Sequence, residues 1–131
     1  MADTRMKILI VDDYFDMRKI LKSLLSQLGY KNIYEAEDGD TAWAKLNKEN
    51  FDLILADWNM PKMNGLDLLK NIRASENCKN TLFVMITAKA NKNSIVAAIQ
   101  AGANDYIVKP FKADALEEKI NKIFGHFKKH S

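Results

Sequence analysis

The sequence has little of several residue types that would point directly to a function. It contains one cysteine, Cys78, in 131 residues, which excludes an intramolecular disulfide and a cysteine-only metal site and suits a reducing compartment. It lacks the Gly-rich loop followed by Lys and Ser or Thr that a P-loop nucleotide hydrolase needs. The longest apolar runs, such as Ile8–Val11 and Leu82–Ile86, are far shorter than the roughly 20 residues that span a bilayer. The charged N-terminus also lacks the apolar core of a signal peptide. We therefore expect a soluble, cytoplasmic protein with no membrane insertion.

Charge of one sign is not in large excess either. The chain carries 20 Lys and Arg against 17 Asp and Glu, a formal net charge of +3. This mild basicity is far from the dense positive face that holds a phosphate backbone. The basic residues near the C-terminus, Lys119, Lys122, Lys128 and Lys129, are interspersed with acidic ones, as is typical of a solvated helix face. We expect no nucleic-acid partner.

The chain does contain an alternation of short apolar runs and helical spacings. The predicted strands are Lys7–Val11, Asn32–Ala36, Leu53–Ala56, Leu82–Thr87 and Asp105–Val108. Short continuous apolar runs of this kind suit strands buried on both faces of a parallel sheet. The apolar faces predicted for the intervening helices are Met17, Ile20, Leu21, Leu24, Leu25 and Leu28; Ala42, Trp43 and Leu46; Leu66, Leu69 and Ile72; Ile95, Ala98 and Ile99; and Leu116, Ile120, Ile123, Phe124 and Phe127.

These strand–helix repeats predict a doubly wound α/β sandwich. With no linker or low-complexity segment in the sequence, we expect a single domain over residues 1–131, with its core at about 6–127 and no effector domain. We also expect a monomer.

Polar residues stand at the ends of four predicted strands. Asp12 and Asp13 follow the first strand, and Asp57 closes the third. Thr87 ends the fourth strand, and Lys109 follows the fifth. Since ligand sites in such sheets lie at the carboxyl ends of the strands, we expect these side chains to converge. Each has a structural explanation when taken singly, such as a helix N-cap for Asp13, but their joint occurrence favours a functional site.

The expected cluster of carboxylates also predicts a cofactor. Carboxylates that share a crevice repel one another and need a counter-charge, which a divalent cation and Lys109 would supply. Ligands that are all oxygen favour Mg²⁺, with Mn²⁺ as a substitute.

Pro110 directly follows the last predicted strand and Lys109. A cis Lys109–Pro110 bond would reorient the chain at this point. Only about 5–6% of such bonds in folded proteins are cis, so the sequence by itself favours the trans form and leaves the isomer open.

This set of residues, Asp12-Asp13, Asp57, Thr87 and Lys109-Pro110, resembles the receiver domain of two-component response regulators. The runs Asp57–Pro61, Asn64-Gly65 and Tyr106–Phe111 are similar to those of the stand-alone chemotaxis regulators of CheY type within that family. The resemblance extends from about Met6 to Phe124. It implies a flavodoxin-like (βα)5 fold with a parallel sheet in the order 2-1-3-4-5.

The resemblance also implies roles for individual residues. Asp57 would accept a phosphoryl group from a histidine kinase. Mg²⁺ would be held by the side chains of Asp13 and Asp57 and the backbone carbonyl of Asn59, with Asp12 acting through water. Lys109 and Thr87 would contact the phosphoryl oxygens. The protein would be a signalling phosphoacceptor rather than an enzyme, although it would catalyse its own phosphorylation and slow dephosphorylation.

The output that the resemblance implies is a change of surface. Movement of Thr87 toward the phosphoryl group would vacate space for Tyr106. The implied switch and output residues are Thr87, Ala90, Tyr106, Val108, Lys112 and Lys119. The implied target is the flagellar motor switch, with a phosphatase as a further partner; the alternative is a phosphate sink or a regulator of a non-motor partner.

The chain departs from the closest family pattern around the expected site. The loop after the acidic pair reads Tyr14-Phe15-Asp16, where related chains carry small hydroxyl residues after the aromatic. Lys89 stands where many of them have Glu, and Lys112 where they often have a capping Thr. We hypothesise that these changes alter phosphorylation and hydrolysis rates and partner choice.

Two other functions use related folds or chemistry. A phosphatase of the haloacid dehalogenase type needs a second Asp two residues after the nucleophile, and that position is Asn59 here. A flavodoxin-like flavin carrier needs a phosphate-binding loop after the first strand, where Asp12-Asp13 would repel the phosphate.

Overall fold

The computed structural model describes residues 5–89 and 91–129. Strands and helices alternate through it in the order β1 (Lys7–Val11), α1 (Phe15–Gln27), β2 (Asn32–Ala36), α2 (Gly39–Lys48), β3 (Leu53–Asp57), α3 (Gly65–Ala74), β4 (Leu82–Thr87), α4 (Lys92–Gln100), β5 (Asp105–Val108) and α5 (Ala113–Lys129). The predicted strand bounds are confirmed, except that β3 extends by one residue to Asp57. No helix in the described part of the chain is both long and apolar enough to cross a bilayer.

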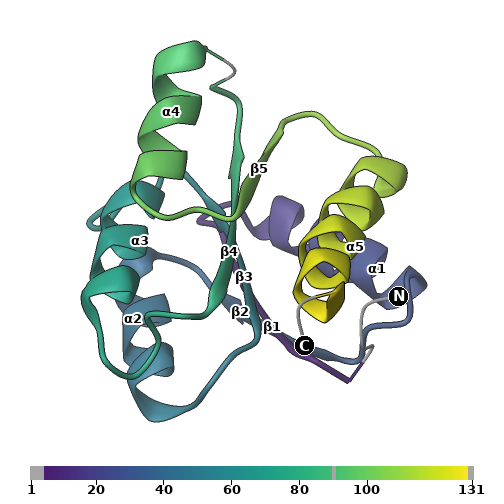
Figure 1. Ribbon diagram of the computed structural model, residues 1–131, viewed down its shortest axis with the longest axis horizontal. Helices are drawn as coiled ribbons and strands as arrows, with labels where there is room; N and C mark the ends of the chain where they lie inside the picture. Colours follow the sequence, from purple (N-terminus) through teal and green to yellow (C-terminus); the bar gives the residue numbers. More distant parts are fainter. Residues whose placement is uncertain (1–4, 90, 130–131) are drawn as a thin grey trace.

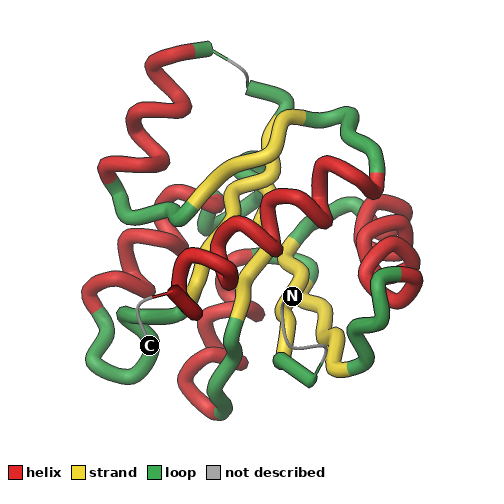
Figure 2. The backbone as a smooth tube through the Cα atoms, turned by 45° about the vertical axis from the view of Figure 1, so that its right-hand side comes forward, coloured by secondary structure: helices red, strands yellow, loops and turns green. Residues whose placement is uncertain are grey.

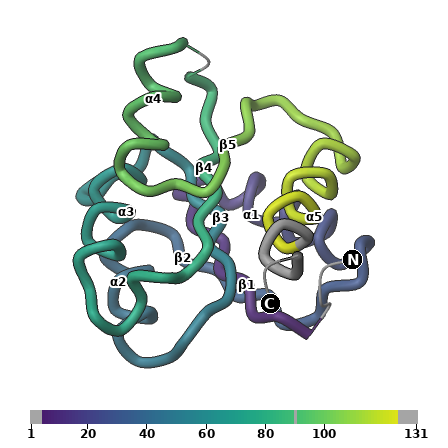
Figure 3. The backbone as a smooth tube through the Cα atoms, viewed as in Figure 1, coloured from purple at the N-terminus to yellow at the C-terminus, as the bar shows by residue number. Residues whose placement is uncertain are grey.

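The strands form one parallel sheet in the order β2-β1-β3-β4-β5, as expected. Figure 3 shows how the chain starts inside the sheet at β1, moves outward to β2, and then crosses back to β3 and on to β5 at the other edge. The order of the strands therefore reverses between β1 and β3. Because the connections after these two strands leave in opposite directions, a crevice opens at their carboxyl ends.

Helices cover both faces of the sheet. Helices α1 and α5 lie on one side, and α2, α3 and α4 lie on the other (Figure 1), with the strands running between the two layers (Figure 2). Alternate residues of the same strand face opposite layers: Leu9 of β1 packs with the α2–α4 layer, and Ile10 with the α1–α5 layer. This two-sided burial explains why the central strands are continuously apolar instead of alternating with polar residues.

Most predicted helix faces pack as expected, and two residues do not. Ile20 of α1 and Ile99 of α4 were assigned to buried faces, but they are 51% and 46% exposed. The buried stripe of α1 is narrower than the apolar pattern and centres on Leu21 and Leu25. The side chain of Phe127 lies outside the described residues.

Gly65, the first residue of α3, allows the helix to approach β3 closely. A Cβ atom at this position would lie 2.3 Å from the carbonyl oxygen of Asp57 and 3.0 Å from Sδ of Met85. We expect Gly65→Ala to lower the free energy of unfolding by about 2–3 kcal/mol, the cost of forcing extra volume into a packed site. Urea-induced unfolding measures the change.

A second substitution tests whether this cost comes from the backbone contact. The carbonyl oxygen cannot be removed by mutation, so adding Met85→Ala to Gly65→Ala should not restore stability. Recovery in the double variant would show that the Met85 side chain, and not the Asp57 carbonyl, limits the approach of the helix.

Candidate functional site

The loop between β1 and α1 holds Asp12 in a fixed position and leaves Asp13 exposed. Asp12 is 1% exposed; its backbone N–H donates to the carbonyl of Ala36 at 3.1 Å. Its Oδ1 accepts from the backbone N–H of Tyr14 at 2.9 Å. The N-cap position of α1 is Tyr14, so the alternative role of Asp13 as a helix cap is wrong.

Backbone hydrogen bonds beyond the regular ladders hold the ends of β3, β4 and β5 together. The N–H of Trp58 donates to the carbonyl of Ile86 at 3.2 Å, and the N–H of Lys109 donates to the carbonyl of Thr87 at 2.8 Å. Asp57 and Thr87 end β3 and β4 and are 9% and 2% exposed. The residues predicted at three strand ends therefore lie at the same edge of the sheet.

Lys109 joins the two buried carboxylates of this edge. Its Nζ lies 3.2 Å from Oδ2 of Asp12 and 3.2 Å from Oδ1 of Asp57. One oxygen from each of Asp12, Asp13 and Asp57 lies within 4.8 Å of the others. Three carboxylates against one ammonium leave an excess of negative charge, and a set of oxygen donors this close together fits a hard divalent cation.

Burial and charge act in opposite directions on Asp57. Burial raises the pKa of its carboxyl, Lys109 lowers it, and the neighbouring Asp12 raises it again, with a net rise above the ordinary value of 3.8. The ionised form is therefore less stable here than in water. A bound cation would favour the ionised form.

Thr87 and Tyr106 face a common closed space. The Thr87 Oγ1 accepts from the backbone N–H of Lys89 at 2.9 Å. Trp58 and Met85 also line this gap, which has no room for a water molecule. Tyr106 is half-buried, so any further inward movement of its ring requires Thr87 or its neighbours to move first.

A groove runs along β5 and the start of α5, beside the closed gap. It has a volume of about 730 Å³. Its lining includes the predicted output residues Tyr106, Val108, Lys112 and Lys119. Lys119 pairs with Asp105 at 3.0 Å, and its Nζ lies 5.7 Å from the centre of the Tyr106 ring. Ala90, the remaining predicted output residue, lies outside the described residues.

Bulky and charged side chains neighbour the site residues in the chain. Tyr14 and Phe15 are 66% and 60% exposed, and Asp16 is also exposed. The Lys89 Nζ lies 5.2 Å from the centre of the ring of Trp58, the residue that follows Asp57 in the chain. Asn59, two residues beyond Asp57, is exposed in the loop that leads to α3.

Three features of the site were not predicted from the sequence. The Lys109–Pro110 bond is cis, against the base rate for such bonds. Gly65 is needed for the approach to Asp57 described above. Arg18 donates to the backbone carbonyl of Asp12 at 2.6 Å. Gly65 offered a usable signal, since it directly precedes the predicted apolar face that begins at Leu66, whereas Arg18 resembles any charged residue on a helix.

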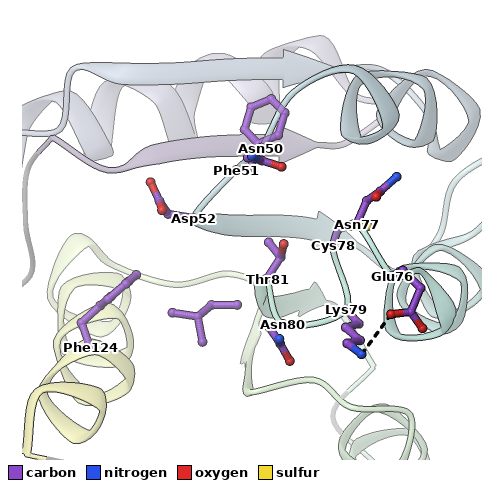
Figure 4. A pocket seen from close by; sticks show the side chains of 11 residues that line it. Asn50, Phe51, Asp52, Glu76, Asn77, Cys78, Lys79, Asn80, Thr81 and Phe124 are labelled. Atoms are coloured by element: carbon purple, nitrogen blue, oxygen red, sulfur yellow. Dashed lines mark hydrogen bonds and ion pairs between the residues drawn. The ribbon is translucent and has the colours of Figure 1, made fainter. Parts of the chain in front are cut away.

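A second hollow lies at the opposite edge of the sheet, near the amino ends of β3 and β4 (Figure 4). It has a volume of about 410 Å³, and segments 50–52 and 76–82 and Phe124 line it. The only ion pair drawn there joins Lys79 to Glu76 at 3.3 Å, within one loop. Most of the other polar groups are neutral and spread around the rim, so they define no ligand chemistry.

Known proteins have similar sequences. Chemotaxis protein CheY-3 of Vibrio cholerae is 57% identical over 119 residues, covering 91% of this chain and 92% of its own. Chemotaxis protein CheY of Pseudomonas aeruginosa is 54% identical over 119 residues, covering 91% and 96%. The chain is thus closely related to chemotaxis proteins of CheY type.

Solved structures match the fold as well, among them two that contain magnesium. The receiver domain of a sensor histidine kinase from Pseudomonas aeruginosa, which has a magnesium ion coordinated in its active site cleft, matches with a TM-score of 0.84 and 30% identity, over 92% of this chain and 98% of its own. A CheX–CheY–BeF3–Mg²⁺ complex from Borrelia burgdorferi matches with a TM-score of 0.85 and 30% identity, over 91% and 89%.

The family model for the response regulator receiver domain matches residues 8–121. This range contains every carboxylate of the cluster, Thr87 and Lys109. The chain belongs to the response regulator receiver domain family.

Proposed function

We propose that this protein is a stand-alone response regulator that accepts a phosphoryl group on Asp57 from a histidine kinase. The observation that carries the proposal is the placement of Lys109, 3.2 Å from both Asp12 and Asp57 in a cluster of three carboxylates. Asp57 is the member of this cluster that ends a central strand, with Thr87 at the end of the neighbouring strand.

The cluster would hold Mg²⁺ through Asp13, Asp57 and the backbone carbonyl of Asn59, with Asp12 acting through water. The metal, when bound, neutralises charge on the phosphoryl oxygens and orients the phosphoryl group. The same oxygen donors are compatible with Mn²⁺. The magnesium ions in both matching solved structures support this assignment.

In the transfer, a carboxylate oxygen of Asp57 forms a bond to phosphorus while the bond from phosphorus to the donor breaks. The leaving group keeps the bonding electrons and takes a proton from water. Lys109 is placed to move from its contacts with Asp12 and Asp57 to the added phosphoryl oxygens, and the Thr87 hydroxyl can donate to another. Attack of a water molecule on the product at the same site would allow its slow hydrolysis. The chain is then a phosphoacceptor whose own residues promote transfer.

The output would be a change of the α4–β5–α5 surface in the cytoplasm. If Thr87 turns toward the phosphoryl group, the closed gap beside it opens to Tyr106. The groove along β5 then changes shape at Tyr106 and Lys119. We propose the flagellar motor switch as the target because CheY proteins are close relatives. A non-motor target or a phosphate sink is the alternative. A phosphatase is a further candidate partner, and the CheX–CheY complex shows that a CheY protein can bind a second protein.

The test is incubation of the protein with Mg²⁺ and acetyl phosphate, followed by intact-mass spectrometry. We expect the mass of one phosphoryl group to be added, and a chelator to prevent the addition. An unchanged mass in the presence of Mg²⁺ would refute the proposal. Pull-down of a flagellar switch subunit by phosphorylated but not by unmodified protein separates the motor target from the alternatives.

The pH dependence of cation binding follows from the state of Asp57. Because burial, opposed by Lys109, leaves its pKa above the ordinary 3.8, the carboxyl gains its proton at a higher pH than an exposed Asp does. Mg²⁺ affinity and the phosphorylation rate should both fall as pH decreases through that raised value. Titration with Mg²⁺ at several pH values, followed by tryptophan emission, measures this. A Mg²⁺ affinity that stays constant down to the ordinary pKa of 3.8 would contradict this prediction.

The rim residues of the site, Phe15, Asp16 and Lys89, should change the rates of phosphoryl gain and loss without changing the residue that is phosphorylated. Lys89→Glu reverses a charge beside Trp58, and we expect it to slow phosphorylation by the anionic donor acetyl phosphate by about two- to fivefold, because exposed charges contribute up to about 1 kcal/mol. Phe15→Ser with Asp16→Thr reverses the departures in the loop after the acidic pair and should also alter the rates of phosphoryl gain and loss. Stopped-flow fluorescence measures them.

The matched control is Lys48→Glu, a charge reversal at the far end of α2. We expect its rates of phosphoryl gain and loss to equal those of the parent protein within experimental error. Unchanged rates in all the rim variants would show that the rim does not tune the reaction.

A further inference from the structure

Arg18, in the first turns of α1, contacts the acidic loop through the protein backbone. Its Nη1 donates to the carbonyl oxygen of Asp12 at 2.6 Å, and its Nε lies 3.3 Å from Oε1 of Glu35 on β2. The Arg18 and Glu35 side chains are only 12% and 19% exposed. A largely buried guanidinium therefore bridges the loop that carries the acidic pair to the neighbouring edge strand.

We infer that Arg18 is a positioning residue for the cation site and that Glu35 orients it. This inference rests on the proposed function. The carbonyl that Arg18 holds belongs to the peptide unit between Asp12 and Asp13. Because a peptide unit is planar, fixing its oxygen also fixes the direction in which the chain enters Asp13. Asp13 is exposed, so its position depends on this backbone constraint more than on packing around its side chain.

The other contacts of Asp12 support the same conclusion. Its backbone N–H is held by Ala36, its Oδ1 by the N–H of Tyr14, and its Oδ2 by Lys109. The carbonyl is the remaining polar group of the residue, and Arg18 is its donor. Groups behind a metal site that fix its ligands typically contribute 10–100-fold to metal affinity.

The positive charge of Arg18, taken alone, predicts the opposite change in Mg²⁺ affinity: a gain when Arg18 is removed. A positive group near three carboxylates weakens cation binding by electrostatic repulsion, so its loss should strengthen binding if charge is all that matters. If Arg18 acts by position, its loss should weaken binding. The sign of the change therefore separates the two roles.

The test compares Arg18→Met with the parent protein in a Mg²⁺ titration followed by tryptophan emission. We expect affinity to fall about tenfold. In the metal-free protein, hydrogen exchange at the Tyr14 amide should also become faster, because the loop that presents Oδ1 of Asp12 is no longer held. Unchanged or stronger Mg²⁺ binding would overturn the inference.

Lys22→Met is the matched control. Lys22 also pairs with Glu35, at 3.7 Å, but it is more exposed, with 47% of its side chain accessible. Removing it deletes a positive charge and an ion pair with the same carboxylate, and we expect Mg²⁺ affinity to stay within about twofold. An equal loss of affinity in both variants would overturn the positioning role.

A second variant protects the test against a failure to fold. Arg18→Lys keeps the charge but cannot contact Asp12 and Glu35 with the fixed fork of a guanidinium. We expect an affinity between those of the parent and Arg18→Met, and an affinity equal to the parent's would overturn the inference. If the parent itself shows no Mg²⁺ binding, the proposed function fails together with the inference. If the parent binds and both Arg18 variants bind equally well, the positioning role alone fails.

Discussion

Asp57→Asn is expected to abolish phosphorylation by acetyl phosphate and, in the absence of divalent cations, to stabilise the protein. The amide cannot form the acyl phosphate, so intact-mass spectrometry should find no phosphoryl group even at saturating Mg²⁺. An equal mass gain in this variant would show that another residue is the acceptor.

The gain in stability follows from the raised pKa of Asp57. Burial is the largest cause of the rise, and Lys109 only partly offsets it. An acid whose pKa rises on folding binds its proton more tightly in the native state, so the native state loses stability as pH rises from the ordinary value of 3.8 through the raised value. Asparagine removes this loss. Urea unfolding of the metal-free proteins at neutral pH should therefore show a higher free energy of unfolding for Asp57→Asn.

The pH profile provides an internal control for that gain. The advantage of Asp57→Asn should shrink as pH falls through the raised pKa, because the parent then carries a neutral carboxyl too. Asp38 is the N-cap of α2, and its pKa is lowered mainly by the hydrogen bonds that its carboxylate accepts from the backbone N–H and the side chain of Thr41. It should lose its stabilising effect only at still lower pH, in both proteins alike. A constant difference at all pH values would contradict the electrostatic explanation.

Lys109→Met should have a large effect of opposite sign on the metal-free protein. It leaves the carboxylates of Asp12 and Asp57, whose side chains are 2% and 12% exposed, without their shared cation. Removing one member of a buried ion pair costs about 3–5 kcal/mol, and urea unfolding should show a loss of this order. Mg²⁺ affinity should rise at the same time, because the ion no longer competes with an ammonium group for the same oxygens.

Mg²⁺ should consequently restore much of the lost stability, since a ligand that binds only the native state stabilises it. Lys119→Met is the matched control: it removes the partner of Asp105, but Lys119 is 33% exposed, and we expect a loss of about 1 kcal/mol or less. If Lys109→Met were as stable as the parent without Mg²⁺, the ammonium would not be compensating the buried carboxylates.

The sequence determined the architecture of this protein because the relevant signals are local. Apolar runs at strand length located the strands to within one residue, and apolar spacings at helix period located the helices between them. The same signals were less accurate for Ile20 and Ile99, because an apolar residue beside a helix's apolar stripe is buried only if a neighbour covers it.

The sequence also determined the membership of the acidic cluster. Asp12 and Asp57 are 45 positions apart in the chain, but Asp12 follows β1 and Asp57 ends β3, and parallel strands deliver their carboxyl ends to one edge. Topology thus converts a pattern of strand ends into a pattern in space, and the convergence of Asp12, Asp13, Asp57 and Lys109 could be predicted without coordinates.

Only the tertiary structure decided how these residues are held. It buries Asp12 and exposes Asp13, although the two are adjacent and chemically identical, because the loop turns one side chain under Lys109 and the other toward solvent. It also gives Gly65 its close approach to Asp57 and Arg18 its contact with Asp12. Distances, burial and competing contacts depend on neighbours from distant segments of the chain, so no local pattern specifies them.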